Sequence, residues 1–290
     1  MSGPLEPLEG VPPRAGTPPP GGGSDPGLVV VGADSASSGP AVSSGAVEPA
    51  RRPLELSLVM PCYNEEAALP LSIPPLLARL REIGVACEVV LVDNGSRDGT
   101  ARVIDSFGPP VRRVDVPVNR GFGWGVLVGL GAARGRFVGY LGSDGQILPE
   151  DVVRAFWAVQ PFPQGKVVTK VRRVTRGDGP IRWLVTTIYN RLFWVLFGAL
   201  TDDVNGTPKF FLREDLATLD LGSEDWFLDA EVMIKAKRLG WKLVEVPVDF
   251  LPRTRGRSSV RFKTLFEFLK NLLRWRFGRL AAWARRRAAP

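Results

Sequence analysis

The pattern of apolar and polar positions predicts buried strands that alternate with amphipathic helices from residue 54 onward. Apolar runs at 56–61, 87–93 and 111–116 each end in polar turn residues and lead toward a helical segment. After the first run, leucine and isoleucine recur over 69–83 at the spacing of a helix with one buried face. This alternation indicates an α/β fold with a mainly parallel sheet.

A fourth apolar run, beginning at Val138, carries the most informative chemistry. It stops at Asp144 and Gln146, and Pro149 with Glu150 then opens a helix. Both polar side chains are therefore expected beyond the carboxyl end of a buried strand, where open α/β sheets bind their ligands. Taken alone, an aspartate beside a turn glycine is more often a capping residue than a metal ligand.

The second half of the chain continues with a stretch over 202–211 that turns back into a strand, a helix from Glu224 to Leu239 and a strand at 243–248. The most apolar region, 181–200, has two interpretations: buried core, or a face lying in a membrane interface. Because Asn190 and Arg191 interrupt it, no transmembrane helix is expected.

The two ends differ from this central domain, which we place at 54–261. Residues 1–53 are rich in Pro, Gly, Ser and Ala without periodicity, which predicts a disordered tail. In 262–290 apolar and aromatic positions interleave with lysine and arginine. This pattern predicts a basic amphipathic helix on a membrane surface.

Charge supports that interpretation of the C-terminal segment. The chain carries a net charge of +8, and twelve of its lysines and arginines follow residue 252 against the single acid Glu267. Basic charge confined to one aromatic-rich helical tail fits an anionic membrane better than a nucleic acid, so no nucleic-acid partner is expected.

Two residue counts restrict the chemistry. The absence of histidine excludes a histidine base, a Ser-His-Asp triad and a His-ligated metal, so acid–base work and metal binding fall to carboxylates, amides or the substrate. Two cysteines are too few for a disulfide framework and indicate reduced thiols in the cytosol.

Four motifs follow one another at the predicted strand ends. They are Pro61-Cys-Tyr-Asn-Glu-Glu66, Val92-Asp-Asn-Gly-Ser-Arg-Asp-Gly-Thr100, Asn119-Arg-Gly-Phe-Gly-Trp-Gly125 and Ser143-Asp-Gly-Gln146. In this order the chain resembles family-2 glycosyltransferases of the GT-A fold over residues 55–262, with the closest likeness to polyprenyl-phosphate (dolichyl-phosphate-mannose-synthase-like) sugar transferases. The resemblance implies a Rossmann-like, mixed but mainly parallel sheet flanked by helices, with a C-terminal amphipathic helix.

The resemblance also implies a reaction. A hexose would pass from a UDP- or GDP-sugar to a polyprenyl phosphate, with inversion and with Mg²⁺ or Mn²⁺, on the cytosolic face of a membrane and with room for an integral membrane partner. Asp144 and Gln146 would hold the metal, because divalent cations take oxygen ligands and neutralise the leaving diphosphate. The family's first metal aspartate is replaced here by Gly142.

The first three motifs would bind the nucleotide sugar. Tyr63 offers a flat face for stacking, Asp93 can accept a base N–H or a ribose hydroxyl, and Asn94 stands where many relatives carry a second aspartate. The full expected set is Pro61, Tyr63, Asn64, Glu65, Asp93, Ser96, Asp98, Asn119 and Gly121.

The acceptor side remains open between two kinds of substrate. A hydroxyl acceptor needs a general base, for which Asp229 and Glu231 are the candidates, whereas a phosphate acceptor is already anionic and needs cations. The cations expected to meet phosphate lie in the family's R-x-x-G-x-S segment, and Arg253 is also a catalytic candidate. With the serine of that segment they are Arg253, Arg255, Arg257 and Ser258. A third alternative is a catalytically silent nucleotide- or membrane-binding homologue.

Overall fold

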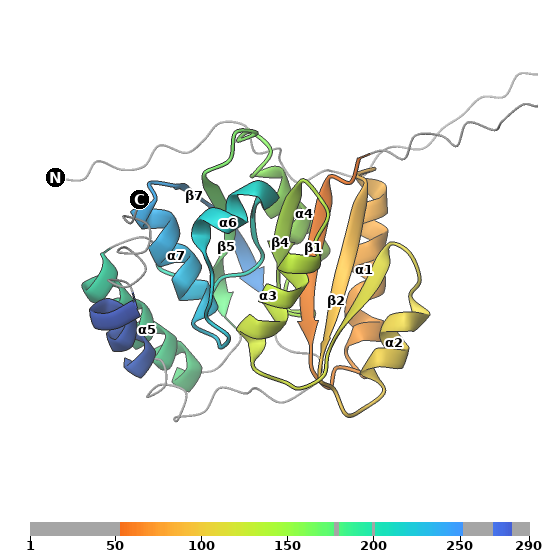
Figure 1. The fold of residues 1–290 in the computed structure, drawn as a ribbon, viewed down its shortest axis with the longest axis horizontal. Helices are drawn as coiled ribbons and strands as arrows, with labels where there is room; N and C mark the ends of the chain where they lie inside the picture. The colour runs from red at the N-terminus through yellow and green to blue at the C-terminus, as the bar shows by residue number, and fades with distance from the viewer. Residues whose placement is uncertain (1–52, 177–179, 199–200, 252–268, 280–290) are drawn as a thin grey trace, which may run out of the picture. The chain divides into compact units, whose positions relative to one another are not determined.

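The computed structural model describes residues 53–176, 180–198, 201–251 and 269–279 (Figure 1). The segments predicted as an N-terminal tail and as the arginine-rich R-x-x-G-x-S stretch lie outside these residues, as do large parts of the predicted C-terminal helix. The strands are β1 (Leu56–Cys62), β2 (Cys87–Asn94), β3 (Val111–Val116), β4 (Phe137–Tyr140), β5 (Val167–Arg176), β6 (Lys209–Leu212) and β7 (Lys242–Phe250).

The helices are α1 (Leu69–Glu82), α2 (Thr100–Ser106), α3 (Phe122–Ala132), α4 (Pro149–Trp157), α5 (Pro180–Phe197), α6 (Leu216–Leu219), α7 (Leu228–Arg238), the 3₁₀ turn η1 (Arg213–Asp215) and the π-helical turn η2 (Trp275–Arg279).

α4 illustrates how the sequence sets the start of a helix. Pro149 occupies the first turn, where its missing N–H costs nothing, and Glu150 and Asp151 lie at the positive end of the helix dipole.

One seven-stranded sheet organises the domain, in the order β3-β2-β1-β4-β6-β5-β7. β6 is antiparallel to β4 and β5, and the other neighbouring pairs are parallel. This arrangement confirms the mixed, mainly parallel sheet that the sequence predicted. The carboxyl ends of β1, β2, β4 and β5 therefore meet at one edge, where β6 begins.

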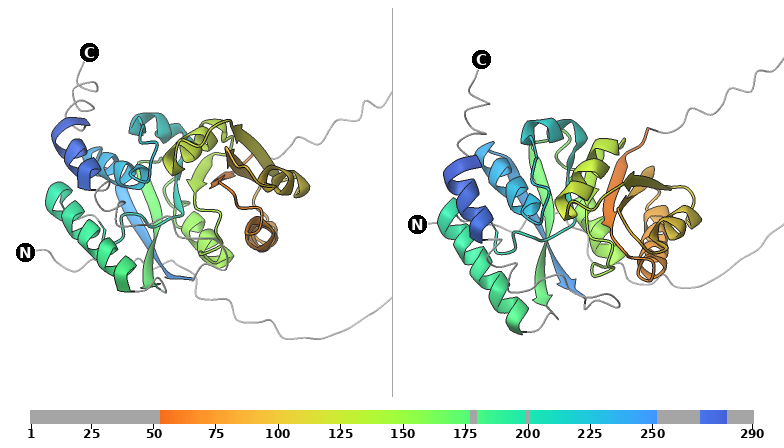
Figure 2. Two further views of the ribbon diagram at one scale, coloured as in Figure 1. Left: turned by 90° about the horizontal axis from the view of Figure 1, so that it is seen from below. Right: turned by 60° about the horizontal axis from the view of Figure 1, so that its bottom comes forward.

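Helices cover both faces of the sheet (Figures 1 and 2). α1, α2 and α4 bury their leucines, isoleucines and valines on one face together with the inward side chains of β1 and β2. α3, α6 and α7 cover the other face against valines of β1, β2 and β4. A third cluster joins α5, α7 and the 269–279 segment through buried residues that include Tyr189, Phe193, Leu272 and Trp275.

The structure corrects several expectations about the elements. α5 runs continuously through Asn190 and Arg191, although within the described residues no helix is both long and apolar enough to cross a membrane. α7 begins at Leu228 rather than at Glu224. β5 was not predicted at all.

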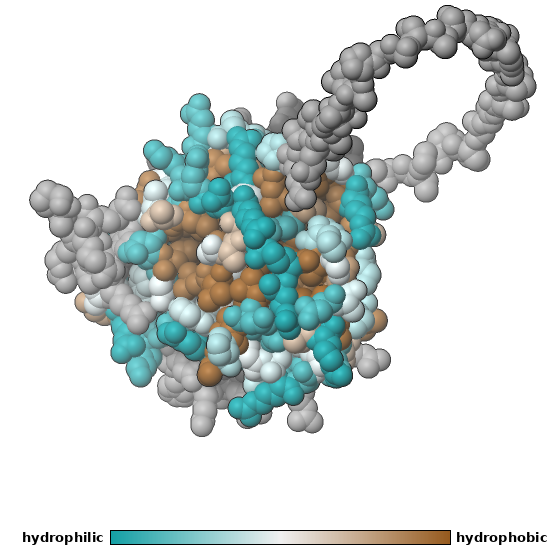
Figure 3. Space-filling view, turned by 45° about the vertical axis from the view of Figure 1, so that its right-hand side comes forward, coloured by the Kyte–Doolittle hydropathy of each residue, from teal (hydrophilic) through white to brown (hydrophobic). Residues whose placement is uncertain are grey.

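Apolar side chains also reach the surface. Figure 3 shows one face of the domain, on which apolar residues are exposed on both sides of a band of hydrophilic residues. On α5, Trp194 is 50% exposed and Val195 66% exposed, while Phe277 in the C-terminal segment is 73% exposed. One face of α5 is therefore core, as the first interpretation of 181–200 predicted, and another face is exposed, for which the membrane interface stays a prediction.

Candidate active site

The loops after β1 and β2 interlock at the carboxyl edge of the sheet. Asn64 N donates to Ser96 Oγ at 3.1 Å, and Arg97 N donates to Asn64 Oδ1 at 2.8 Å. Glu65 N donates to Thr100 Oγ1 at 2.9 Å. These bonds hold the loops together and leave Tyr63, next to them, largely exposed.

The carboxylates of the second motif also hold the loop. Asp93 is buried and accepts from Ser96 N at 3.0 Å. Asp98 accepts from Thr100 N at 3.0 Å and from Glu66 N at 3.3 Å. Partial burial raises the pKa of Asp98, but these bonds outweigh it and leave the pKa below its usual value.

The third motif packs against the segment that precedes α7. Asn119 Oδ1 accepts from Gly121 N at 2.8 Å, and the buried Asn94 donates through Nδ2 to Gly121 O at 2.9 Å. A Cβ on Gly121 would lie 2.6 Å from the Glu224 carbonyl oxygen, so only glycine permits this approach. Asn94, which stands where many relatives carry an aspartate, therefore has a structural role: its side chain anchors the loop of the third motif.

Two further contacts close this junction. Arg120 forms an ion pair with Glu224, and the rings of Phe122 and Trp226 stack with centroids 4.5 Å apart. No local pattern predicts this contact, because Arg120 and Glu224 are 104 positions apart in the chain.

The fourth motif forms a loop that faces the same edge. Ser143 Oγ donates to the Pro61 carbonyl at 3.2 Å, which ties this loop to the end of β1. Asp144 Oδ1 accepts from Gln146 N at 3.3 Å. Gln146 is buried, and its Nε2 donates to Leu251 O at 2.9 Å at the end of β7.

These residues fit a divalent cation that completes its shell with substrate phosphates. Mg²⁺ and Mn²⁺ accept one or two protein carboxylates together with phosphate oxygens and water, and Asp144 could supply one carboxylate. In the described part of the chain no group of three or more acidic or cysteine side chains could hold a metal. A Cβ on Gly142 would meet Asp144 Oδ1 at 3.6 Å, which is ordinary contact distance, so a second carboxylate would fit beside the first.

Asp229 and Glu231, the two expected bases, are buried on α7 and already engaged. Asp229 is 3% exposed; it accepts from Tyr140 OH at 2.9 Å and forms an ion pair with Lys209. Glu231 is 1% exposed; it accepts from Ser223 N at 2.7 Å and pairs with Lys235 at 2.6 Å. The structure thus brings neither of them to an open surface.

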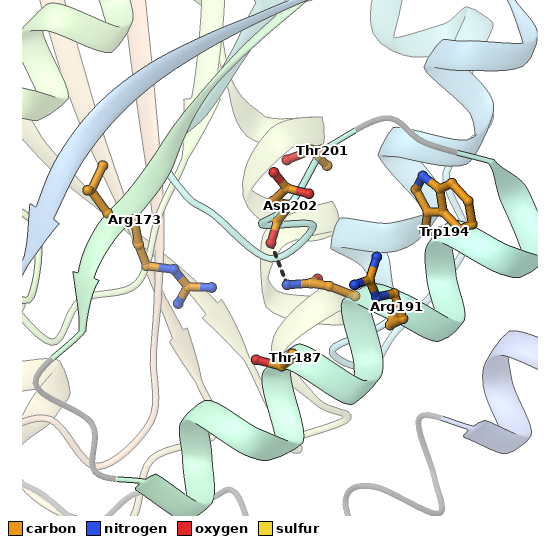
Figure 4. Close-up of a pocket in the computed structure, with 8 residues that line it drawn as sticks. Arg173, Thr187, Arg191, Trp194, Thr201 and Asp202 are labelled. Atoms are coloured by element: carbon orange, nitrogen blue, oxygen red, sulfur yellow. Dashed lines mark hydrogen bonds between the residues drawn. The ribbon is translucent and has the colours of Figure 1, made fainter.

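A cavity of about 560 Å³ opens at the carboxyl end of β5, between this strand, α5 and the loop before β6 (Figure 4). Arg173 reaches into it from β5 and Thr187 from α5. Its full lining is Arg173, Val174, Thr187, Asn190, Arg191, Trp194, Thr201 and Asp202. Sequence reasoning missed it, because its polar residues follow no motif and come from three separate segments.

The guanidinium of Arg173 is held in place at this cavity by an ion pair. Its guanidinium forms two bonds with the buried carboxylate of Asp203, Nε to Oδ2 at 2.9 Å and a terminal nitrogen to Oδ1 at 2.6 Å. Burial raises the pKa of Asp203, but the bonds and charge of Arg173 dominate and hold it well below its usual value. Asn190 Nδ2 donates to Asp202 O at 2.5 Å and fixes α5 against the loop.

Comparison with known proteins identifies the fold and the family. The chain is similar to glucosyl-3-phosphoglycerate synthase of Mycobacterium tuberculosis, solved with Mn²⁺, UDP and phosphoglyceric acid, at 23% identity and a TM-score of 0.60, covering 77% of this chain and 78% of that one. This likeness shows the fold, which is that of GT-A glycosyltransferases.

Two relatives are similar in sequence. The undecaprenyl-phosphate mannosyltransferase of Micrococcus luteus is 28% identical over 246 residues, which are 79% of this chain and 96% of the relative. The undecaprenyl-phosphate 4-deoxy-4-formamido-L-arabinose transferase of Pectobacterium carotovorum is 30% identical over 75% of this chain, but the alignment spans only 66% of that protein. The model of glycosyl transferase family 2 matches residues 57–219, which include all four motifs. The chain therefore belongs to glycosyl transferase family 2, as its motifs predicted.

Proposed function

We propose that this protein transfers a sugar from a nucleoside-diphosphate donor to a polyprenyl phosphate at a membrane surface. The observation that carries the proposal is the engagement of both α7 carboxylates in buried ion pairs, Asp229 with Lys209 and Glu231 with Lys235. A hydroxyl acceptor requires a base, whereas a phosphate acceptor arrives as an anion and requires only cations. The names of the two sequence relatives agree with a lipid-phosphate acceptor.

The cavity at β5 is the proposed place for the acceptor phosphate. Arg191 provides an exposed guanidinium there, the guanidinium of Arg173 lies beside it in its pair with Asp203, and Thr187, Asn190 and Thr201 provide hydrogen-bonding groups. Guanidinium groups suit phosphate because they donate two bonds in one plane. Arg253, Arg255, Arg257 and Ser258 lie outside the described residues, and we retain them as a further source of phosphate contacts.

The donor side is proposed to use the interlocked loops. Tyr63 stacks on the base and Asp93 accepts a hydrogen bond from the nucleoside, while Asn64, Ser96, Asp98, Asn119 and Gly121 hold these loops in shape, as their bonds indicate. Pro61 lies in β1, and Glu65 lies in the loop that follows this strand. A divalent cation held by Asp144, with Gln146 beside it, would neutralise charge on the leaving diphosphate.

The exposed apolar residues of α5 support the membrane location. Trp194 lines the cavity, and Val195 beside it in α5 is exposed. If this face of α5 lay in the membrane interface, the phosphate of a membrane lipid would be close to the cavity. We place the protein peripherally on the cytosolic face, where an integral membrane partner could receive the product.

A hydroxyl acceptor is the second candidate, and one observation favours it. Asp202 is exposed and lines the cavity, so it is the carboxylate available there as a base. With a hydroxyl acceptor, Asp202→Asn would lower kcat about a hundredfold or more, whereas transfer to phosphate would change little. Measuring kcat for this variant therefore separates the two acceptors.

The donor and the metal are tested by transfer of label from UDP- and GDP-hexoses into the organic phase. Purified protein, polyprenyl phosphate and Mg²⁺ or Mn²⁺ are combined, with a chelator in a parallel reaction. Asp144→Asn should lower the rate about a hundredfold or more, because a charge-stabilising group is lost, while the melting temperature stays the same. Absence of transfer from every donor, despite nucleotide binding, would support the catalytically silent alternative.

A further inference from the structure

A row of polar side chains crosses four neighbouring strands of the sheet. Tyr140 on β4 is the register partner of Lys209 on β6, Lys209 is that of Lys170 on β5, and Lys170 is that of Glu245 on β7. Both lysines are fully buried. Since lysine is seldom buried without a charged partner, each lysine has its own, Asp229 for Lys209 and Glu245 for Lys170, and the backbone pairing of β5 with β6 sets the two lysines side by side.

At one end of the row, α7 is bonded to β4, the strand that precedes the loop carrying Asp144. Asp229 on α7 forms an ion pair with Lys209 and accepts from Tyr140 OH at 2.9 Å. Tyr140 is the last residue of β4, and Asp144 follows it in the next loop. The position of Asp229 is thus linked to the start of this loop.

The other end reaches the wall of the cavity. Lys170 Nζ donates to Glu245 Oε1 at 3.0 Å and to Thr201 Oγ1 at 3.3 Å. Thr201 also donates to Glu245 Oε1 at 2.5 Å and lines the cavity. The row therefore extends from the strand before Asp144 to the cavity proposed for the acceptor.

We propose that Lys209 is a positioning residue for sugar transfer, because it fixes the acceptor cavity relative to the loop that carries Asp144. On one side Lys209 binds Asp229, which also accepts from Tyr140. On the other side it is paired through the backbone of β5 with Lys170, whose side chain bonds to Thr201 at the cavity wall. The inference rests on the proposed function. Transfer needs the two reacting groups at a fixed separation, and a misplacement of about 1 Å can cost about a hundredfold in rate.

Stability alone does not account for the pair. Replacement of a buried ion pair by apolar residues of similar volume is often neutral or stabilising, whereas removal of one partner leaves an uncompensated charge. A doubly substituted protein can therefore keep its fold and lose only the positioning. This difference makes the proposal testable.

Charge at Lys209 is sensitive to alkaline pH. Four groups act on it, namely Asp229 from α7, Tyr140 from β4, Lys170 from β5 and Asp203 from the loop before β6. Burial and the charge of Lys170 lower the pKa of Lys209, Asp229 and Asp203 raise it, and the combined effect leaves the pKa at about 8. Above that pH the lysine loses its proton and the ion pair with Asp229 is lost.

The test is the double variant Lys209→Met/Asp229→Asn, in which methionine keeps the length of the lysine stem and asparagine keeps an acceptor for Tyr140. We expect an unchanged melting temperature, unchanged nucleotide affinity and unchanged KM for the donor, with kcat lowered about tenfold or more. The wild-type kcat should fall as pH rises through about 8, and this fall should be absent in the double variant. Lys209→Arg, which keeps the charge, should recover part of the rate.

The matched control is Glu88→Gln/Arg112→Met. This pair, with 3.1 Å between Arg112 Nε and Glu88 Oε2, is also inside the sheet, but Glu88 lies at the opposite end of β2 from the site. It should keep the wild-type kcat. A Lys209/Asp229 double variant that is folded and has the wild-type kcat and pH profile would overturn the proposal.

Amide hydrogen exchange tests the positioning role without any measurement of turnover. Without substrate, the double variant should exchange faster than the wild type and the control at 141–146 and 201–206, with the rest of the domain unchanged. Equal exchange in all three proteins would refute the positioning role even if no acceptor were found. Absence of transfer by the wild type would instead refute the proposed function alone.

Discussion

Gln146 and the backbone of Leu251 are joined by two hydrogen bonds, one from the side chain of Gln146 and one to its backbone carbonyl. Gln146 Nε2 donates to Leu251 O at 2.9 Å, and Leu251 N donates to Gln146 O at 3.0 Å. The loop that carries Asp144 is thereby attached to the end of β7. Gln146 thus orients this loop, in addition to any contact of its amide oxygen with a cation.

Gln146→Glu should weaken metal binding, although a carboxylate is nominally the better ligand. Glutamate cannot donate to Leu251 O when ionised, so the anchor is lost and the loop is less well oriented. We expect the affinity for Mn²⁺ with UDP or GDP to fall about tenfold or more, as for other groups that orient a ligand. Calorimetric titration measures it, and tighter binding by Gln146→Glu would contradict the anchoring role.

Gly142→Asp should strengthen metal binding. A Cβ at this position meets Asp144 Oδ1 at ordinary contact distance, 3.6 Å, so the new side chain fits and adds a second carboxylate. We expect the affinity for Mn²⁺ to rise at least about tenfold, because affinity follows the number of charged ligands. Gly142→Asn is the neutral control of equal size, and equal affinity in both variants would show that position 142 lies away from the cation.

Asp203→Asn should destabilise the fold, because it leaves Arg173 partly buried without its carboxylate. The expected loss is about 3 kcal/mol in the free energy of unfolding, the range for a broken buried pair. The pKa of Asp203 is lowered in the folded state, so its stabilising effect is present above the ordinary aspartate pKa of about 4 and is lost as pH falls below it.

Denaturant titrations at pH 7 and pH 3 measure this effect. The difference between wild type and Asp203→Asn should shrink at the lower pH. Asp202→Asn, at the exposed neighbouring position, should change the stability by less than about 0.5 kcal/mol at either pH. A loss that is equal at both pH values would show that the ion pair is not its source.

Trp194→Glu/Val195→Glu should weaken membrane binding. Each apolar side chain is worth about 1.5–3 kcal/mol when buried, so the double change should lower vesicle affinity by at least about tenfold. Flotation with anionic phospholipid vesicles measures it. Val118→Glu, at a 67% exposed position in the loop after β3, is the control and should bind as the wild type does.

Much of the fold could be predicted because most buried strands are continuous apolar runs in the sequence. β1, β2 and β4 were found in this way, and their carboxyl ends located the four motifs. β5 was missed because it carries Lys170 and adjacent arginines, which are typical of exposed segments. In the fold Lys170 is buried, because its ammonium group donates hydrogen bonds to Glu245 and Thr201, which come from distant segments of the chain.

The site could be predicted only where a motif marks it. The start of α7 was misplaced because Glu224 and Asp225 resemble a helix start, whereas Arg120 pairs with the first and Phe227 N bonds to the second at 2.9 Å. The engagement of Asp229 by Lys209 depends on strand pairing that no local pattern reveals. The motifs at the strand ends could therefore be found in the sequence. The contacts that side chains make across the sheet, such as that between Lys209 and Asp229, could not.

The most direct test of the proposed function compares two acceptors that differ only in the phosphate. Initial rates are measured with a polyprenyl phosphate and with the corresponding polyprenol, under the same donor, metal and detergent. Transfer to the phosphate alone, with the rate retained in Asp202→Asn, is the predicted result. Transfer to the free alcohol at a comparable rate, abolished by Asp202→Asn, would contradict the account.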